Sequence, residues 1–160
     1  PHGRASNARL PRRGFVVLDF GVILSGYCSD MTRTVHIGAP NARARHIYET
    51  VREAQAAAVA AIKPGRTFAE IDWAARQVIE QEGFGKHFTH STGHGVGLEI
   101  HEPPRLGAGQ KGKLKPGMVI TVEPGIYVSG VGGVRIEDMV LVTVRGSEVI
   151  TRGSKKLITL

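Results

Sequence analysis

Two helical segments lie back to back in the middle of this chain, with short apolar runs typical of β-strands on both sides. The first helix is expected to begin after the N-cap candidate Asn41 and to end at Lys63-Pro64-Gly65. Thr67 and Glu70 have the spacing of a capping box that opens the second helix, and Gly83 is expected to end it. Apolar residues recur at helical spacing in both segments: Ile47, Val51, Ala54, Ala58 and Ile62, then Phe68, Ile71, Ala75, Val78 and Ile79.

The flanking segments predict the β part of the fold. Phe15 to Leu18 is a short apolar run, and the glycine-punctuated stretch after it predicts strand, turn and strand up to Ile37. Gly132-Gly133 is expected to form the tight turn between two later strands. The later strands are expected in an antiparallel sheet over residues 119–122, 126–128, 134–136 and 139–144. Strands, two helices and then strands predict an α+β domain.

Composition limits the classes of function. The chain has 160 residues, 41% of them hydrophobic, as expected for one globular domain with a buried core. The net charge of +7 can indicate nucleic-acid contact, but only 6% of residues are aromatic and no stacking motif accompanies the basic clusters. We therefore favour an ordinary solvated surface and expect no nucleic-acid partner.

The sequence predicts neither a membrane-spanning helix nor an internal disulfide. No apolar run approaches the roughly 20 residues that a membrane-spanning helix needs. The single cysteine, Cys28, cannot form an internal disulfide, which favours a reducing, cytoplasmic location.

Four acidic residues adjoin apolar runs, where an unpaired carboxylate is costly. Asp19 ends the first run, Asp30 follows it, and Glu123 and Glu137 lie beside later strand-like runs. Taken alone, either aspartate can be a turn residue or a cap, or Asp30 can form a local salt bridge and hydroxyl bonds with its neighbours Thr32, Arg33 and Thr34. Arg135 can compensate one of the four carboxylates but not all of them, whereas two divalent cations can.

Three histidines lie close together in a glycine-rich stretch: His90, His94 and His101. Any single one can be a structural histidine whose ring nitrogens are satisfied, but three among glycines favour a site. Oxygen ligands with one imidazole favour manganese, cobalt or iron over a thiolate zinc site. Two such ions about 3.5–4 Å apart activate a shared, bridging hydroxide, which is hydrolytic chemistry.

The motifs that contain these residues resemble those of the pita-bread metallopeptidases, from His2 to about Thr143. Within that family they are more similar to Xaa-Pro aminopeptidase and Xaa-Pro dipeptidase (prolidase) than to methionine aminopeptidase. The matching segments are Asp19-Phe-Gly, Gly26-Tyr-Cys-Ser-Asp30-Met-Thr-Arg-Thr, His94-Gly-Val-Gly-Leu-Glu-Ile-His101-Glu-Pro, Val122-Glu123-Pro-Gly and Gly133-Val-Arg-Ile-Glu137-Asp.

The resemblance implies a pita-bread fold, in which helices cover an antiparallel sheet. It also implies that residues 1–160 form a single C-terminal catalytic domain, with the first part of that domain and a separate N-terminal domain absent from the chain.

The resemblance further implies a set of metal ligands. Asp19 is expected to chelate one ion, His94 and Glu123 to hold the other, and Asp30 and Glu137 to bridge the pair. The cofactors are then two divalent ions, with Mn²⁺ favoured and Co²⁺, Zn²⁺ or Fe²⁺ left open.

Other residues acquire catalytic roles by the same resemblance. His90 and His101 match positions that contact substrate and stabilise the tetrahedral intermediate or move protons. His2 matches a further substrate-contacting histidine, and Arg135 a residue that supports the site through polar contacts. Glu123 is in addition a candidate for proton transfer to the leaving imino nitrogen.

Together these expectations predict a dinuclear metal-dependent exopeptidase that cleaves between an N-terminal residue and a following proline. Its partner is a peptide with proline at the second position, and a homo-oligomer is left open. Aminopeptidase is favoured only slightly over dipeptidase. The alternatives from other classes are a non-catalytic binding module on the same fold and, third, a basic nucleic-acid binder.

Overall fold

The computed structural model describes residue 3 and residues 6–160. Its helices and strands lie in separate groups along the chain, as expected for an α+β domain, with the two helices between an early and a late group of strands. In chain order they are β1 (Gly14–Phe20), β2 (Ile23–Leu24), β3 (Tyr27–Cys28), β4 (Met31–Ile37), α1 (Ala42–Ala61), α2 (Phe68–Gln81), the 3₁₀ turn η1 (Gly85–His87), β5 (Gly93–Gly95), β6 (Glu102–Leu106), β7 (Val119–Val122), β8 (Gly125–Val128), β9 (Gly132–Arg135), β10 (Asp138–Val142), β11 (Ser147–Val149) and β12 (Ile158–Thr159).

The strands form two sheets and two hairpins. The first sheet has the order β1-β4-β12, the second has the order β11-β10-β7-β5-β6, and the hairpins are β2-β3 and β8-β9. Strand β12, which lies outside the predicted strands, pairs parallel with β4, whereas β7 with β10 and β8 with β9 pair antiparallel as expected. None of the described helices is both long enough and apolar enough to cross a membrane.

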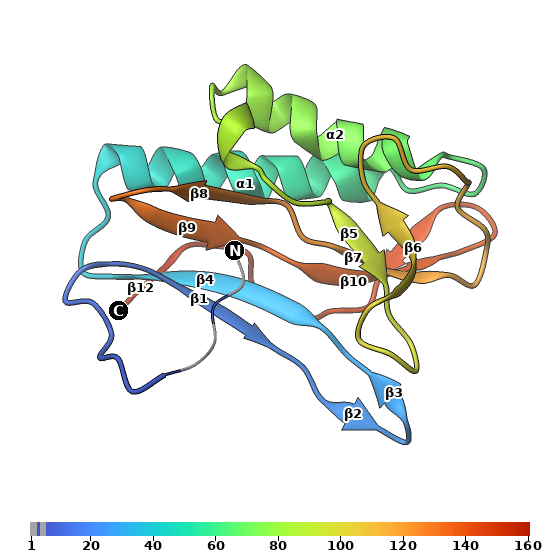
Figure 1. Cartoon of the computed structure of the whole chain (residues 1–160), viewed down its shortest axis with the longest axis horizontal. Helices are drawn as coiled ribbons and strands as arrows, with labels where there is room; N and C mark the ends of the chain where they lie inside the picture. Colours follow the sequence, from blue (N-terminus) through green and yellow to red (C-terminus); the bar gives the residue numbers. More distant parts are fainter. Residues whose placement is uncertain (1–2, 4–5) are drawn as a thin grey trace.

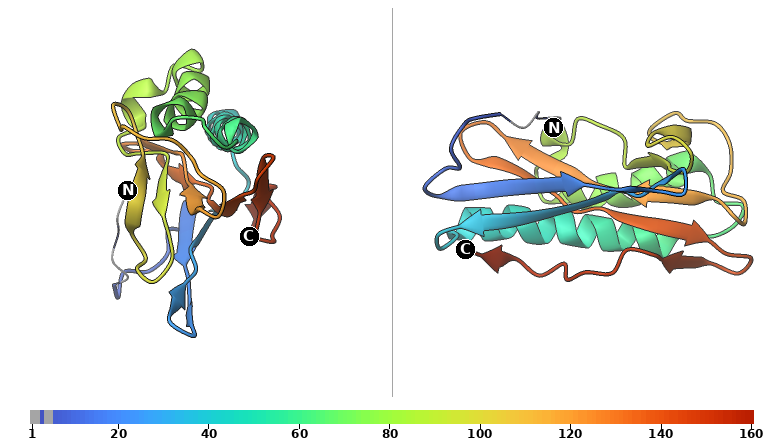
Figure 2. Two further views of the ribbon diagram at one scale, coloured as in Figure 1. Left: turned by 90° about the vertical axis from the view of Figure 1, so that its right-hand side faces the viewer. Right: turned by 90° about the horizontal axis from the view of Figure 1, so that it is seen from below.

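The helices form a layer over the strands (Figure 1). Helix α1 packs against β7, β8 and β9, while α2 packs against α1 and β6. Strands β1 and β4 pack against β9, and the view from below places them on the side away from the helices (Figure 2). The helix layer therefore covers one side of the strands, and the paired strands β1 and β4 lie on the opposite side of the domain.

Local signals placed both helices correctly. The Asn41 side chain accepts a hydrogen bond from the Ala44 amide at 2.8 Å, and Thr67 and Glu70 form both bonds of the capping box. The helices end at Ala61 and Gln81, just before their stop signals, because the residue before Pro64 is sterically restricted and Gly83 adopts a φ of 79°. Their predicted apolar faces form the core with the strands, and Ile47, Val51, Ile71 and Ile79 are fully buried.

The expected turn at Gly132-Gly133 was wrong. The β8–β9 turn lies at residues 129–131, and both glycines belong to β9. Gly133 lies opposite Tyr127 in the hairpin, and a Cβ atom on it would lie 2.6 Å from Tyr127 Cδ1. Glycine is therefore required here by the close approach of an aromatic ring rather than by a turn.

Candidate metal centre

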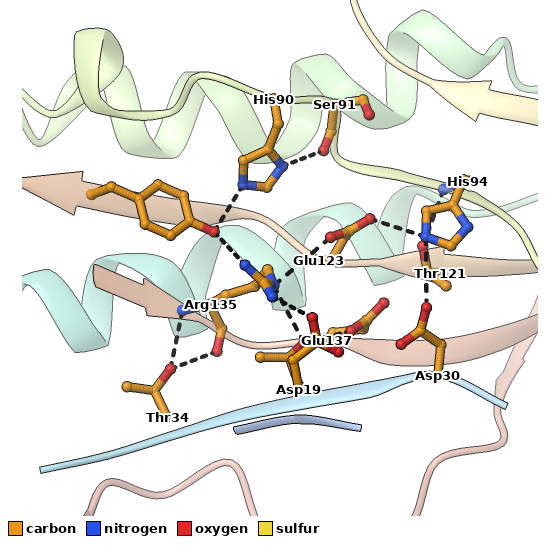
Figure 3. A network of polar contacts seen from close by, with 12 residues as sticks. Asp19, Asp30, Thr34, His90, Ser91, His94, Thr121, Glu123, Arg135 and Glu137 are labelled. Carbon is orange, nitrogen blue, oxygen red and sulfur yellow. Dashed lines mark hydrogen bonds and ion pairs between the residues drawn. The ribbon is translucent and has the colours of Figure 1, made fainter. Parts of the chain in front are cut away.

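Five predicted side chains converge from five separate parts of the chain (Figure 3). Each of them lies in a strand or directly beside the end of one. Asp19 is in β1, Asp30 directly precedes β4, His94 is in β5, Glu123 follows β7, and Glu137 lies between β9 and β10.

The ligand atoms fall into overlapping groups whose members lie within 4.8 Å of one another. One group is Asp19, Asp30 and Glu137, and a second is His94, Glu123 and Glu137. A third contains Asp30, His94 and His101. Asp30, His94 and Glu137 each belong to two of the three groups, so the groups overlap and form one continuous cluster.

Burial and like charge make Glu137 the most perturbed residue of the cluster. Its side chain is 2% exposed, and burial, followed by the carboxylates of Glu123 and Asp30, raises its pKa to about 8. Burial and Asp19 likewise raise the pKa of Asp30, against the opposing effect of His94. Carboxylates that repel one another in this way fit divalent cations, which supply the missing positive charge through oxygen ligands.

His94 presents one ring nitrogen to these carboxylates. Its Nδ1 lies 2.9 Å from the Gly95 carbonyl, which can only accept, so Nδ1 carries the proton in the neutral ring. Nε2 then faces Glu123 at 3.3 Å and Asp30 at 3.7 Å. Burial lowers the pKa of His94, but the contacts with Glu123, Gly95 and Asp30 outweigh it and raise the pKa overall.

Asp19 departs from the expectation of a buried carboxylate. Its side chain is 47% exposed because β1 is the edge strand of its sheet. Its described partner is Arg135, which is 4% exposed and donates to Asp19 Oδ2 at 2.5 Å. Arg135 Nε also lies 3.9 Å from Glu123 Oε2, so this guanidinium pairs with two carboxylates of the cluster, Asp19 and Glu123.

Tyr127 was missed from the sequence, although it connects two predicted residues. Arg135 Nη1 donates to its hydroxyl at 2.8 Å, and the hydroxyl lies 3.1 Å from His90 Nε2. His90 Nδ1 lies 2.8 Å from the Ser91 carbonyl, so Nε2 of the neutral ring accepts from Tyr127. Burial raises the pKa of Tyr127, although Arg135 opposes the shift. Its place in an apolar strand run gave no sign of this role.

A cavity of about 560 Å³ adjoins the cluster. His90, His94, His101 and Glu123 line it, with Arg105 among the other lining residues. The His94 and His101 rings lie 4.4 Å apart between centroids. The three histidines thus face one space, as their spacing in a glycine-rich stretch predicted, whereas His2 lies outside the described residues.

Glu137 is fixed by strand β4 through three contacts. Thr32 Oγ1 donates to its carboxylate at 2.6 Å, its amide donates to the Thr32 carbonyl at 3.0 Å, and Arg33 Nη1 donates to its carbonyl at 2.6 Å. Arg33 Nη2 pairs with buried Asp138 at 2.7 Å. Thr32 and Arg33 therefore contact residues 137 and 138, and the alternative in which they pair with Asp30 was wrong.

Gly93 allows β5 to approach β7 next to His94. A Cβ atom on Gly93 would lie 1.9 Å from the Thr121 carbonyl oxygen, and Thr121 Oγ1 accepts from the His94 amide at 3.0 Å. We expect Gly93→Ala to lower the free energy of unfolding by about 1–3 kcal/mol and to weaken Mn²⁺ binding, because His94 is displaced. Denaturant titration and metal titration measure the two effects. Gly146→Ala is the control, since a Cβ there meets nothing within 4 Å, and equal behaviour of the two variants would contradict the prediction.

The fold and the shared carboxylate–histidine cluster define a metallopeptidase domain of the pita-bread class. Specifically, the chain belongs to metallopeptidase family M24, which matches residues 1–144.

Relatives and solved structures agree with this assignment. The chain is 52% identical over 158 residues to an Xaa-Pro dipeptidase of Pyrococcus furiosus, covering 99% of the chain and 45% of that protein. The prolidase structure from Pyrococcus horikoshii has a TM-score of 0.96 at 50% identity, over 99% of this chain and 46% of that one. An X-Pro aminopeptidase structure from Thermotoga maritima has a TM-score of 0.96 at 39% identity, over 100% and 45%. The chain thus spans about 45% of the length of the curated relative.

Proposed function

We propose that this metal centre belongs to an exopeptidase that hydrolyses the bond between an N-terminal residue and a following proline. The observation that carries the proposal is the set of three overlapping ligand groups, any two of which have one residue in common: Asp30, His94 or Glu137. Similarity to proteins named Xaa-Pro dipeptidase and prolidase supports the choice of substrate.

The donor set fits two divalent ions, for which we propose Mn²⁺, with Co²⁺, Zn²⁺ or Fe²⁺ as the alternatives. Asp19 would hold one ion, His94 and Glu123 would hold the other, and Asp30 and Glu137 would complete the ligand set. When bound, such ions lower the pKa of a shared water and polarise the scissile carbonyl.

The remaining chemistry falls to Glu123, His90 and His101, which line the cavity of about 560 Å³, and to Arg135 beside them. Glu123 accepts the proton of the attacking water and delivers it to the leaving imino nitrogen. His90 and His101 contact substrate and stabilise the tetrahedral intermediate. Arg135 holds Asp19 and, through Tyr127, orients the His90 ring.

A dipeptide is the substrate we favour over a longer peptide. Identity is 52% to the Xaa-Pro dipeptidase and 39% to the X-Pro aminopeptidase. This difference replaces the slight preference for an aminopeptidase that the motifs alone suggested. A reducing, cytoplasmic location is part of the proposal, since Cys28 is the only cysteine in this sequence.

A substrate panel with metal control tests the proposal. Ala-Pro, Ala-Pro-Ala and Met-Ala are incubated with the purified protein in Mn²⁺, in EDTA, and in EDTA followed by excess Mn²⁺. We expect Ala-Pro to be cleaved fastest, EDTA to abolish cleavage and Mn²⁺ to restore it.

Three outcomes would contradict parts of this proposal. Unchanged hydrolysis in EDTA excludes the metal-dependent mechanism, and faster cleavage of Met-Ala excludes the preference for proline. A correctly folded protein with a metal content near zero after Mn²⁺ loading supports the binding-module alternative instead.

A further inference from the structure

Helix α2 carries a partly buried ion pair that reaches the histidine-bearing segment of the site. Arg76 Nε donates to Asp72 Oδ2 at 2.8 Å, and Arg76 Nη2 donates to Asp72 Oδ1 at 3.0 Å. Asp72 is 1% exposed. A two-bond arginine–carboxylate pair of this kind fixes both side chains in one geometry.

This pair holds the backbone on both sides of His90. Asp72 Oδ1 accepts from the Thr92 amide at 3.1 Å and from the Thr92 hydroxyl at 2.8 Å. Arg76 donates to the carbonyls of Phe88, at 3.1 Å, and His90, at 3.0 Å. The Arg76 guanidinium also lies over the Phe88 ring, 4.2 Å from its centroid. Four hydrogen bonds from one ion pair thus fix residues 88–92.

The same segment continues to the metal cluster. The Glu123 amide donates to the Thr92 carbonyl at 2.7 Å. Thr92 therefore connects the ion pair on one side to the backbone of a proposed ligand on the other. Among the described residues, Asp72 does not line the cavity of about 560 Å³, whereas Arg76 lines an adjoining cavity of about 280 Å³ that shares His90 with it.

We infer that Asp72 and Arg76 are positioning residues for the reaction, acting through His90. They fix the position of the His90 imidazole by hydrogen bonding to the backbone before and after it. Through the hydrogen bond between the Thr92 carbonyl and the Glu123 amide, they also position Glu123. This inference rests on the proposed function, because it assumes that His90 acts in turnover. A merely structural ion pair would instead contribute to stability without depending on His90.

An ion pair at the start of helix α2, between Arg66 just before the helix and Glu70 in its first turn, supplies a matched control. Arg66 and Glu70 form an exposed ion pair with the same sequence spacing, with side chains 53% and 46% exposed. Arg66→Lys therefore makes the same chemical change as Arg76→Lys outside the buried network. Lysine retains the charge at either position but cannot reproduce the several directed bonds of the guanidinium.

A double-mutant cycle on Ala-Pro hydrolysis tests the inference. We expect Arg76→Lys to lower kcat about tenfold with little change in KM, and Arg66→Lys to leave both near wild type. In a His90→Ala background, Arg76→Lys is expected to lower kcat by less than about twofold, because the group it positions has been removed. An equal loss in both backgrounds would show that Arg76 does not act through His90.

Amide hydrogen exchange provides a readout that needs no activity. We expect exchange at Thr92 and Glu123 to be about tenfold faster in Arg76→Lys than in Arg66→Lys. If the wild-type protein cleaves none of the peptides but these amides open, the proposed function fails and the positioning of residues 88–92 stands. If it cleaves Ala-Pro and the amides are unchanged, the positioning inference fails.

A milder variant covers the case in which Arg76→Lys does not fold. Thr92→Val keeps the ion pair and removes only the hydroxyl donor to Asp72. We expect it to lower kcat about fivefold, the equivalent of one hydrogen bond, again only when His90 is present. Wild-type kcat in Thr92→Val would contradict the inference.

Discussion

Replacement of Glu137 by glutamine is expected to stabilise the metal-free protein at pH 8 while it weakens metal binding. The pKa of Glu137 is raised to about 8 in the folded protein, against an ordinary value of 4.5. As pH rises above the ordinary value, the carboxyl ionises in the unfolded chain before it ionises in the folded protein. The contribution of this group to the free energy of unfolding is therefore fully present at low pH and is lost as pH rises towards 8.

The predicted loss is on the order of 3 kcal/mol between pH 5 and pH 8, at about 1.4 kcal/mol for each pH unit over which only the folded carboxyl stays protonated. Glutamine removes this loss and retains an acceptor for the Thr32 hydroxyl. Asp30 and His94, whose pKa values are also raised, lose stability in the same direction, so the difference between wild type and Glu137→Gln measures residue 137 together with its coupling to Asp30.

Denaturant titration of the metal-free proteins at pH 5 and pH 8 measures the effect, with exposed Glu148→Gln as the matched control. Mn²⁺ titration is expected to show an affinity about 100-fold weaker in Glu137→Gln, the upper end of the about 10–100-fold range for residues that support a ligand, because Glu137 is itself a proposed ligand. A wild-type protein equally stable at the two pH values, or a variant that binds Mn²⁺ normally, would disprove this account of Glu137.

Replacement of Arg135 by methionine is expected to lower the free energy of unfolding of the metal-free protein by about 3–5 kcal/mol. The guanidinium is the buried positive group between Asp19, Glu123 and Tyr127, and its loss leaves these acceptors facing one another. Saturating Mn²⁺ should reduce the loss, because bound cations supply the same compensation.

Thermal or denaturant unfolding with and without Mn²⁺ distinguishes this electrostatic role from packing. Arg45→Met, at an exposed position of α1, is the control and should change stability little in either condition. A loss of equal size with and without Mn²⁺ would mean that Arg135 stabilises the fold independently of the carboxylate cluster.

The helices were predictable because their determinants are local. Asn41, Thr67 and Glu70 specify helix ends within one turn, and the apolar spacing specifies which face is buried. The four carboxylates of the cluster stood out for a related reason, since a carboxylate beside an apolar run calls for compensation wherever it lies.

Contacts that depend on register or on packing between distant segments were not predictable. Tyr127 gains its role only because the hairpin pairs it with Gly133 and turns its hydroxyl towards His90. The expected turn at Gly132-Gly133 was wrong because a glycine pair suits a turn and also a strand beneath an aromatic ring. The parallel β12 strand, with only two residues, has too little local pattern to be distinguished from a loop.

The arrangement of the metal centre has a kinetic consequence. Its side chains come from distant parts of the chain, as in the Thr32–Glu137 contact, whose partners are 105 residues apart. Contacts between residues so far apart in sequence form slowly, because the intervening chain must lose conformational entropy before the contacts can stabilise it. An ion that binds only the completed cluster therefore acts after the folding barrier, and we expect it to slow unfolding far more than it speeds folding.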